Sequence, residues 1–218
     1  MKKIVLVLSL VALLSNVYAQ NASYYQNMGK TLQKMGEAKS EADFQALSNQ
    51  FELIASVEKG EWLPLYYAAQ TTILMVHQGV EKGKVDTYLD KAQTFIDKAL
   101  QINENESEIY VLQGFLHQAR INVDPMSRGQ KYAAMAQVSF EKARAVNPEN
   151  PRIYYLMAMS VINTPKMFGG GKKNALPLFL QAKEKFDGYT PASQLAPNWG
   201  GSSNQAMIDL CQAENGEN

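Results

Sequence analysis

One spacing of small and large residues occurs three times in the 218-residue chain, and it constrains the fold more than any other feature. An alanine is followed by a large apolar residue four positions later and by a second alanine three positions after that. On a helix these positions lie on nearly one face, so the bulky residue stands between two small ones that let another helix approach. The copies are Ala92, Ile96 and Ala99; Ala136, Phe140 and Ala143; and Ala175, Phe179 and Ala182.

The segments around these copies also have helical periodicity. Apolar residues recur at intervals of three and four, and no segment shows the sustained alternation of a strand. The sequence therefore predicts an all-α protein, and regular repetition of helix pairs favours a solenoid. The predicted helices cover residues 22–38, 41–57, 63–79, 86–101, 107–121, 130–146, 150–162, 173–186 and 203–213.

The repeated residues resemble the tetratricopeptide repeat (TPR) family. In that family the first helix of a pair carries an aromatic residue and then a small residue. The second helix carries the alanine spacing described above, and a proline follows it. The Tyr67 repeat lacks the small residue on its first helix. The matching residues, which the resemblance assigns to packing between helices, are Tyr67, Ala92, Ile96 and Ala99; Tyr110, Gly114, Ala136, Phe140, Ala143 and Pro148; and Tyr154, Ala158, Ala175, Phe179 and Ala182.

The repeat length differs from that of the family. The interval from Ile96 to Phe140 is 44 residues and that from Phe140 to Phe179 is 39, whereas TPR units have about 34 and HEAT-like pairs about 40–47. We expect the additional residues in long loops at 119–130 and 163–173. The latter loop resembles one in exported TPR proteins that include the T-component associated with TRAP transporters.

The resemblance implies a right-handed α-α superhelix of about three to four helix pairs. We expect an N-terminal pair at residues 20–60, which is either a degenerate repeat or a cap. Three TPR-like pairs should follow at 61–187. Residues 188–218 should form a loop and a C-terminal capping helix that covers the last apolar edge.

Residues 1–19 have the features of a secretory signal peptide. Lys2 and Lys3 precede an apolar run over 4–14, and cleavage is expected near Ala19. The run is shorter than the roughly 20 residues that cross a bilayer. The sequence thus predicts an exported protein, periplasmic or secreted, with no membrane span in the mature chain. Cys211 is the only cysteine and lies far from the apolar run, which argues against lipid anchoring.

Several function classes find no support in the sequence. The 21 basic residues are matched by 21 acidic ones, which disfavours nucleic-acid binding. His77 and His117 lie on different predicted helices without a second ligand nearby, so we expect structural roles and no metal. The glycine-rich residues 165–172 do not match a phosphate-binding loop, because Lys166 stands where that motif has its first glycine. No nucleophile has a neighbouring base, and we therefore predict a non-enzymatic protein without a cofactor.

The TPR resemblance implies binding of a protein or peptide on the concave face. An alternative is a self-associating structural module of the cell envelope, such as a homodimer, that uses residues 188–218. Another is a T-component-like accessory protein of periplasmic transport. The long loops could also carry the binding surface. In the Tyr67 repeat the groove positions are Ala68, Thr72 and Met75. The candidate partner-binding residues of the other two repeats are Val111, Phe115, Gln118, Arg152, Tyr155, Met159, Ile162 and Asn163.

Overall fold

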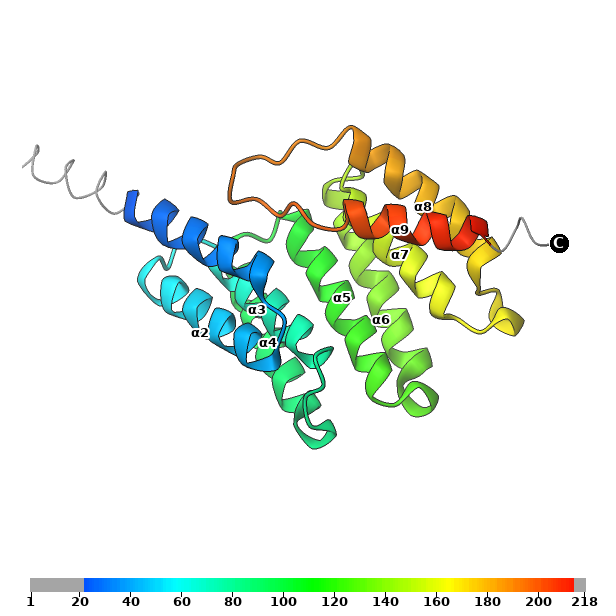
Figure 1. Ribbon diagram of the computed structural model, residues 1–218, viewed down its shortest axis with the longest axis horizontal. Helices are drawn as coiled ribbons and strands as arrows, with labels where there is room; N and C mark the ends of the chain where they lie inside the picture. The colour runs from blue at the N-terminus through cyan, green and yellow to red at the C-terminus, as the bar shows by residue number, and fades with distance from the viewer. Residues whose placement is uncertain (1–21, 214–218) are drawn as a thin grey trace, which may run out of the picture.

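The computed structural model describes residues 22–213, and all regular elements within them are helical (Figure 1). This confirms the prediction of an all-α chain; the predicted signal peptide lies outside the described residues. A first helix is described over residues 22–37. The elements after it are α2 (Glu41–Val57), α3 (Leu63–Val76), the 3-10 turn η1 (Lys82–Lys84), α4 (Val85–Ile102), α5 (Ser107–Val123), α6 (Pro125–Val146), α7 (Pro151–Asn163), the 3-10 turn η2 (Lys166–Phe168), α8 (Lys172–Asp187) and α9 (Gly201–Ala213).

Helices that follow one another in the chain pack side by side. α3 packs on α4, α5 on α6 and α7 on α8, which gives three consecutive pairs, while α2 covers α3 from the N-terminal side. The first helices of the pairs also touch one another, α3 with α5 and α5 with α7. These three helices therefore form a layer, the α3–α5–α7 layer, that runs through the molecule (Figure 1).

The alanine-spaced residues lie where the helices of a pair meet. All nine are buried, with exposed fractions of no more than 1%. Gly114 on α5 shows how close the approach is, because a Cβ atom there would lie 2.2 Å from Cε1 of Phe140 on α6. Tyr110 and Tyr154 each donate a hydrogen bond to the carbonyl six residues earlier, that of Glu104 and that of Pro148. The side chain of Pro148 itself is exposed.

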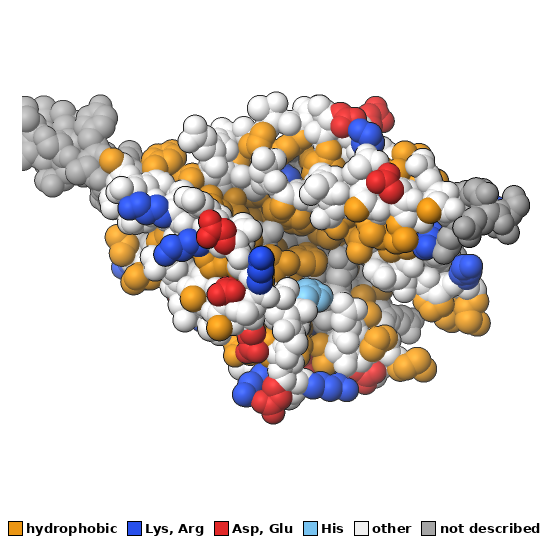
Figure 2. All heavy atoms as spheres, in the orientation of Figure 1, with side chains coloured by type: hydrophobic (Ala, Val, Ile, Leu, Met, Phe, Trp, Pro, Cys, Tyr) orange, Lys and Arg blue, Asp and Glu red, His pale blue; other side chains and the backbone are white. Residues whose placement is uncertain are grey.

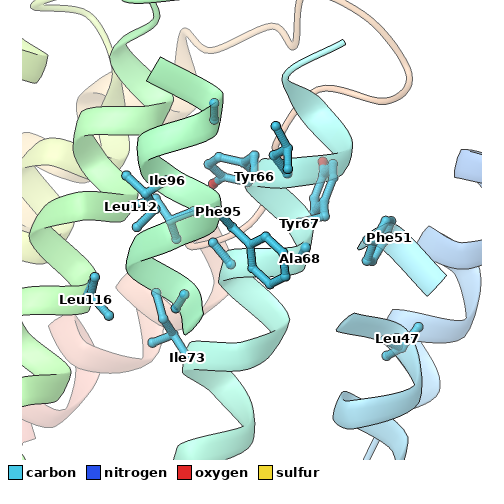
Figure 3. Packing of buried hydrophobic residues seen from close by; sticks show 14 of the residues in the cluster. Leu47, Phe51, Tyr66, Tyr67, Ala68, Ile73, Phe95, Ile96, Leu112 and Leu116 are labelled. Atoms are coloured by element: carbon cyan, nitrogen blue, oxygen red, sulfur yellow. The ribbon is translucent and has the colours of Figure 1, made fainter. Parts of the chain in front are cut away.

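The N-terminal helix pair shares a core with the first repeat. Figure 3 shows Phe51 of α2 facing Tyr67 of α3, and their rings are stacked with centroids 5.3 Å apart. Tyr66 and Ile73 on α3 then pack with buried residues of α4 and α5. The N-terminal pair is therefore continuous with the layers that follow it.

The long loop expected at residues 119–130 is absent, and that prediction was wrong. α5 continues to Val123 and α6 begins at Pro125, which leaves only Asp124 between them. The Asp124 carboxylate accepts a hydrogen bond from the backbone N–H of Ser127 and so caps α6, and Pro125 suits a first helical turn. The additional residues of this repeat therefore lengthen its helices.

Salt bridges to α4 hold this extended end of the α5–α6 pair in place. Arg128 donates two hydrogen bonds to the Asp86 carboxylate, at 2.6 and 2.8 Å, and Arg120 donates to Asp90 at 2.7 Å. The other expected loop, between α7 and α8, is a loop that contains η2.

The C-terminal segment contains a helix that packs on α8, and it also makes a long-range contact that the sequence did not indicate. α9 packs on α8 and buries Ile208 and Cys211 against Phe179. Residues 188–200, which we call the strap, run back across the molecule towards α3 (Figure 1). Leu195 of the strap is buried in the N-terminal core, and its carbonyl accepts a hydrogen bond from the Tyr67 hydroxyl at 2.8 Å.

Candidate functional site

Four rings from four different segments form a continuous series over the α3–α5–α7 layer. His77 follows α3, Phe115 lies on α5, Trp199 lies near the end of the strap and Tyr155 lies on α7. Neighbouring ring centroids are 6.2 Å apart from His77 to Phe115, 6.2 Å from Phe115 to Trp199 and 6.4 Å from Trp199 to Tyr155. His77 is exposed and the other three are half-buried, so each ring keeps contact with solvent. We call this series the aromatic row.

The surface around the row is apolar and recessed. Met159, Ile162 and Met207 are half-buried and pack against the same cluster as Tyr155. Figure 2 shows hydrophobic side chains in a hollow between the first helix and α9, over the layer that carries the row. An apolar, concave surface with few polar groups is the usual form of a small-molecule site.

Two hydrogen bonds, one to the side chain and one to the backbone, fix Trp199 in the row. The indole Nε1–H donates to the Tyr66 hydroxyl at 2.8 Å, and the Trp199 carbonyl accepts from Nη1 of Arg152 at 3.3 Å. Gly200, the next residue, has φ +101°, and a Cβ atom there would lie 2.9 Å from Cζ of Phe186. Only glycine fits this position without strain, so the turn out of the strap is specified by the sequence.

A buried ion pair lies beneath the strap. Arg152 is fully buried, and its Nε and Nη2 groups donate to the Glu108 carboxylate at 2.8 and 2.5 Å. Burial raises the pKa of Glu108 above its ordinary value, although the hydrogen bonds from Arg152 oppose this effect. Burial also works against the charge of Arg152, but the bonds to Glu108 outweigh it and raise the pKa of the guanidinium.

The same guanidinium supports the strap from below. Its central carbon lies 4.5 Å from the centroid of the Tyr189 ring and 5.8 Å from that of Trp199, within the range of cation-π attraction. Arg152 was expected to border the binding surface. In the structure it is covered, and it positions Trp199 from beneath.

Five other residues predicted to bind a partner lie in the aromatic row, beside it, or in a hydrogen-bonded bridge between α5 and α7. Phe115 and Tyr155 both lie in the aromatic row and touch Trp199 from opposite sides, and Met159 and Ile162 lie beside Tyr155. The Gln118 amide bridges α5 to α7 by donating to the Leu156 carbonyl and the Ser160 hydroxyl, each at 2.7 Å.

The remaining predicted positions are less available to a ligand. Val111 is fully buried between helices. Asn163 is exposed, and its amide donates to the Met159 carbonyl in the last turn of α7. Ala68, Thr72 and Met75 are buried because α2 covers this face of α3, and the Ser48 hydroxyl lies 2.8 Å from that of Thr72.

The sequence did not indicate two members of the row. His77 drew attention only as a poor metal ligand, and Trp199 only as part of a self-association surface. Partial desolvation lowers the pKa of His77 below its ordinary value, which favours the neutral imidazole. The one feature that could have drawn attention to Trp199 is its position as a tryptophan in a Pro- and Gly-rich segment. No local sequence pattern predicts that its ring lies next to Phe115 of α5.

The second histidine lies inside the helix layer. His117 is buried, stacks on Tyr132 with centroids 6.0 Å apart and accepts a hydrogen bond at Nε2 from the Gln113 amide at 3.1 Å. Burial, with a smaller contribution from Arg120, lowers the pKa of His117 to about 4. Within residues 22–213, no three His, Cys, Asp or Glu side chains are grouped so that they could hold a metal ion.

Comparison with solved structures identifies a relative. The chain resembles the HusA haemophore from Porphyromonas gingivalis with a TM-score of 0.78 and 30% sequence identity, over 88% of this chain and 94% of that one. This chain belongs to the HusA haemophore family. No family model matches the chain, and neither does any curated protein. Among the described helices of this HusA relative, none combines the length and apolar character needed to cross a bilayer.

Proposed function

We propose that this chain is an exported, non-enzymatic protein that binds haem or a related tetrapyrrole, and that the macrocycle packs against the aromatic row. The observation that carries the proposal is the row itself, because it joins rings from α3, α5, α7 and the strap into one apolar surface. The relationship to a haemophore supports the same ligand class.

The chemistry of the row suits a flat macrocycle. Aromatic rings attract one another with centroids about 4.5–7 Å apart, and a tetrapyrrole offers a much larger apolar face than a side chain does. Met159 and Met207 next to Tyr155 add polarizable, adaptable surface at one end. Ring stacking recognises the macrocycle whether or not it holds iron. His77 at the other end offers an imidazole that could also bind the iron, and Tyr155 offers a phenol that could do the same.

The strap weakens the case for an extended peptide on this face. A TPR protein grips its peptide along the first helices of its pairs, and here residues 188–200 of the chain already cross that layer. Leu195 is buried and bonded to Tyr67, so a peptide would have to displace it. We therefore favour a compact ligand beside the strap over a peptide or protein in its place.

We also infer that the three pairs between residues 61 and 187 are TPR-like repeats. The contact between Gly114 and Phe140 and the equivalent tyrosine hydrogen bonds of Tyr110 and Tyr154 support this assignment. The charged and apolar N-terminal run supports export.

Titration of residues 20–218, which contain every described residue, tests the ligand. Haem and metal-free protoporphyrin IX are added in turn, and the Soret band and the quenching of tryptophan fluorescence are followed. We expect saturable binding of both, with dissociation constants within about tenfold of each other, because stacking does not require iron.

The double variant Phe115→Ala/Tyr155→Ala removes the two rings on either side of Trp199. We expect a loss of about 10- to 100-fold in affinity for both ligands, from two ring contacts of roughly 1 kcal/mol each plus lost apolar area. Phe168→Ala is the matched control, because this ring is 72% exposed and lies outside the row. Equal affinity in the wild type and the double variant would disprove the proposed site. A third variant, His77→Ala, tests the iron: if it loses binding of haem but keeps binding of protoporphyrin, iron ligation dominates.

A further inference from the structure

The loop between α7 and α8 presents two large apolar side chains to solvent. Met167 is 83% exposed and Phe168 is 72% exposed, and both belong to η2. Figure 2 shows hydrophobic atoms standing out where Figure 1 draws this loop, at the end of the molecule away from the first helix. Contact with an apolar partner would remove the exposed apolar area of these adjacent Met and Phe side chains from water, which is favourable.

The backbone of the loop is firmly built, so the exposure follows from the fold. Gly169 and Gly171 have φ values of +83° and +96°, which glycine adopts without strain. The N–H of Gly171 donates to the Val161 carbonyl at 3.0 Å, which ties the end of the loop to α7. A Cβ atom on Gly170 would lie 1.9 Å from the carbonyl oxygen of Thr164, so the two ends of the loop are in close contact.

The charge of this loop differs from that of the chain. Residues 163–175 contain Lys166, Lys172 and Lys173 and no acidic residue, whereas the whole chain has equal numbers of both signs. Lys166 and Lys173 are exposed. The two apolar side chains are therefore bordered in sequence by cations.

We propose that the α7–α8 loop docks the protein on an anionic lipid surface. Phe168 and Met167 enter the boundary between headgroups and acyl chains, and the lysines lie at the level of the lipid phosphates. A protruding tip of two residues suits shallow insertion of this kind. A stable protein interface would need about 1,000 Å² of complementary surface, and a narrow tip offers little of that. This docking is independent of the tetrapyrrole site.

Co-sedimentation with vesicles tests the proposal. Residues 20–218 are used so that the apolar N-terminal run does not itself bind lipid. Vesicles of equal parts phosphatidylglycerol and phosphatidylcholine are compared with vesicles of phosphatidylcholine alone. We expect binding to the anionic vesicles only, and weakening as salt rises from about 0.05 to 0.5 M because the charges become screened.

Two variants separate the contributions. Lys166→Glu/Lys173→Glu should lower the partition coefficient by at least about 25-fold, since each lysine near an anionic surface contributes about a fivefold factor. Met167→Ser/Phe168→Ser should lower it by about tenfold at every salt concentration. Leu53→Ser and Lys98→Glu, exposed positions on α2 and α4, are matched controls that should bind like the wild type.

Circular dichroism should show the same helicity in all variants, because each substituted side chain is exposed. The proposal is overturned if the wild type stays in the supernatant with anionic vesicles at low salt, or if both loop variants sediment with them as the wild type does. If the wild type stays in the supernatant, the partner of the loop would be an acidic protein surface and not a membrane.

Discussion

The two halves of the molecule are stabilised in different ways. The N-terminal half, from the first helix through α5, is joined by one large cluster of buried hydrophobic residues. In the C-terminal half the buried residues form two smaller clusters, one that joins α5, α6, α7 and α8 and one between α7, α8 and α9. Phe115 and Tyr155 of the aromatic row each pack against two of these clusters. The second half therefore depends more on its polar network, the strap and the proposed ligand.

The largest effect should come from the buried ion pair that supports the strap. Arg152→Met leaves the buried Glu108 carboxylate with a hydrogen bond from Asn150 but without its cationic partner. We expect a loss of about 3–5 kcal/mol in the free energy of unfolding, measured by urea denaturation. Lys185→Met breaks an exposed pair with Glu149 and should cost less than about 1 kcal/mol. A loss in Arg152→Met as small as that control would show that the network contributes little to the C-terminal half.

Ligand binding should reduce the difference between the halves. At a free haem concentration of about 100 times the dissociation constant, the free energy of unfolding should rise by about 2.7 kcal/mol. Hydrogen exchange, measured with and without haem, should slow mainly in the strap, α7 and α9. Equal slowing in α2 of the amides that exchange by local opening would contradict the site, because α2 takes no part in the row.

The contact between Gly114 and Phe140 should be the most sensitive point in the middle repeat. Gly114→Ala places a methyl group in the Phe140 ring, and we expect a loss of about 1–3 kcal/mol in thermal or urea unfolding. Gly29→Ala lies on the first helix with open space around it, and it should raise stability by about 0.5–1 kcal/mol. Phe140→Leu should partly rescue Gly114→Ala if the clash with the ring is the cause.

The last prediction concerns pH. The pKa of His117 is lowered to about 4 in the folded protein, against about 6.5 for an ordinary histidine. The unfolded chain therefore takes up the proton first, and the free energy of unfolding should fall as pH decreases from 6.5 towards 4, by at most about 1.4 kcal/mol per pH unit. His117→Gln should remove this part of the slope. An unchanged slope in the variant would mean that carboxylates alone produce it.

The repeated spacing was sufficient to predict the pairs, because packing of Ala92, Phe140 or Ala182 depends on residues close in sequence. Phe115 and Tyr155 were predicted as groove positions from the resemblance to TPR proteins and not from the spacing itself. The sequence predicted a loop between α5 and α6 where the helices in fact continue. They are longer because Asp124 caps α6 and Arg128 pairs with Asp86, and that salt bridge joins residues 42 positions apart. Trp199 could not be placed from the sequence, since its bond to Tyr66 spans 133 residues and follows no periodic pattern.

The strap also determines when the site can form. In most solenoids each repeat contacts only its neighbours, so repeats can fold one after another as they are made. Here the row needs Trp199, which lies near the C-terminus and bonds to Tyr66 in the first repeat. A chain that crosses a membrane from its N-terminus would have its helix pairs in place before this residue arrives. In such a chain the proposed binding surface would be completed last, on the far side of the membrane.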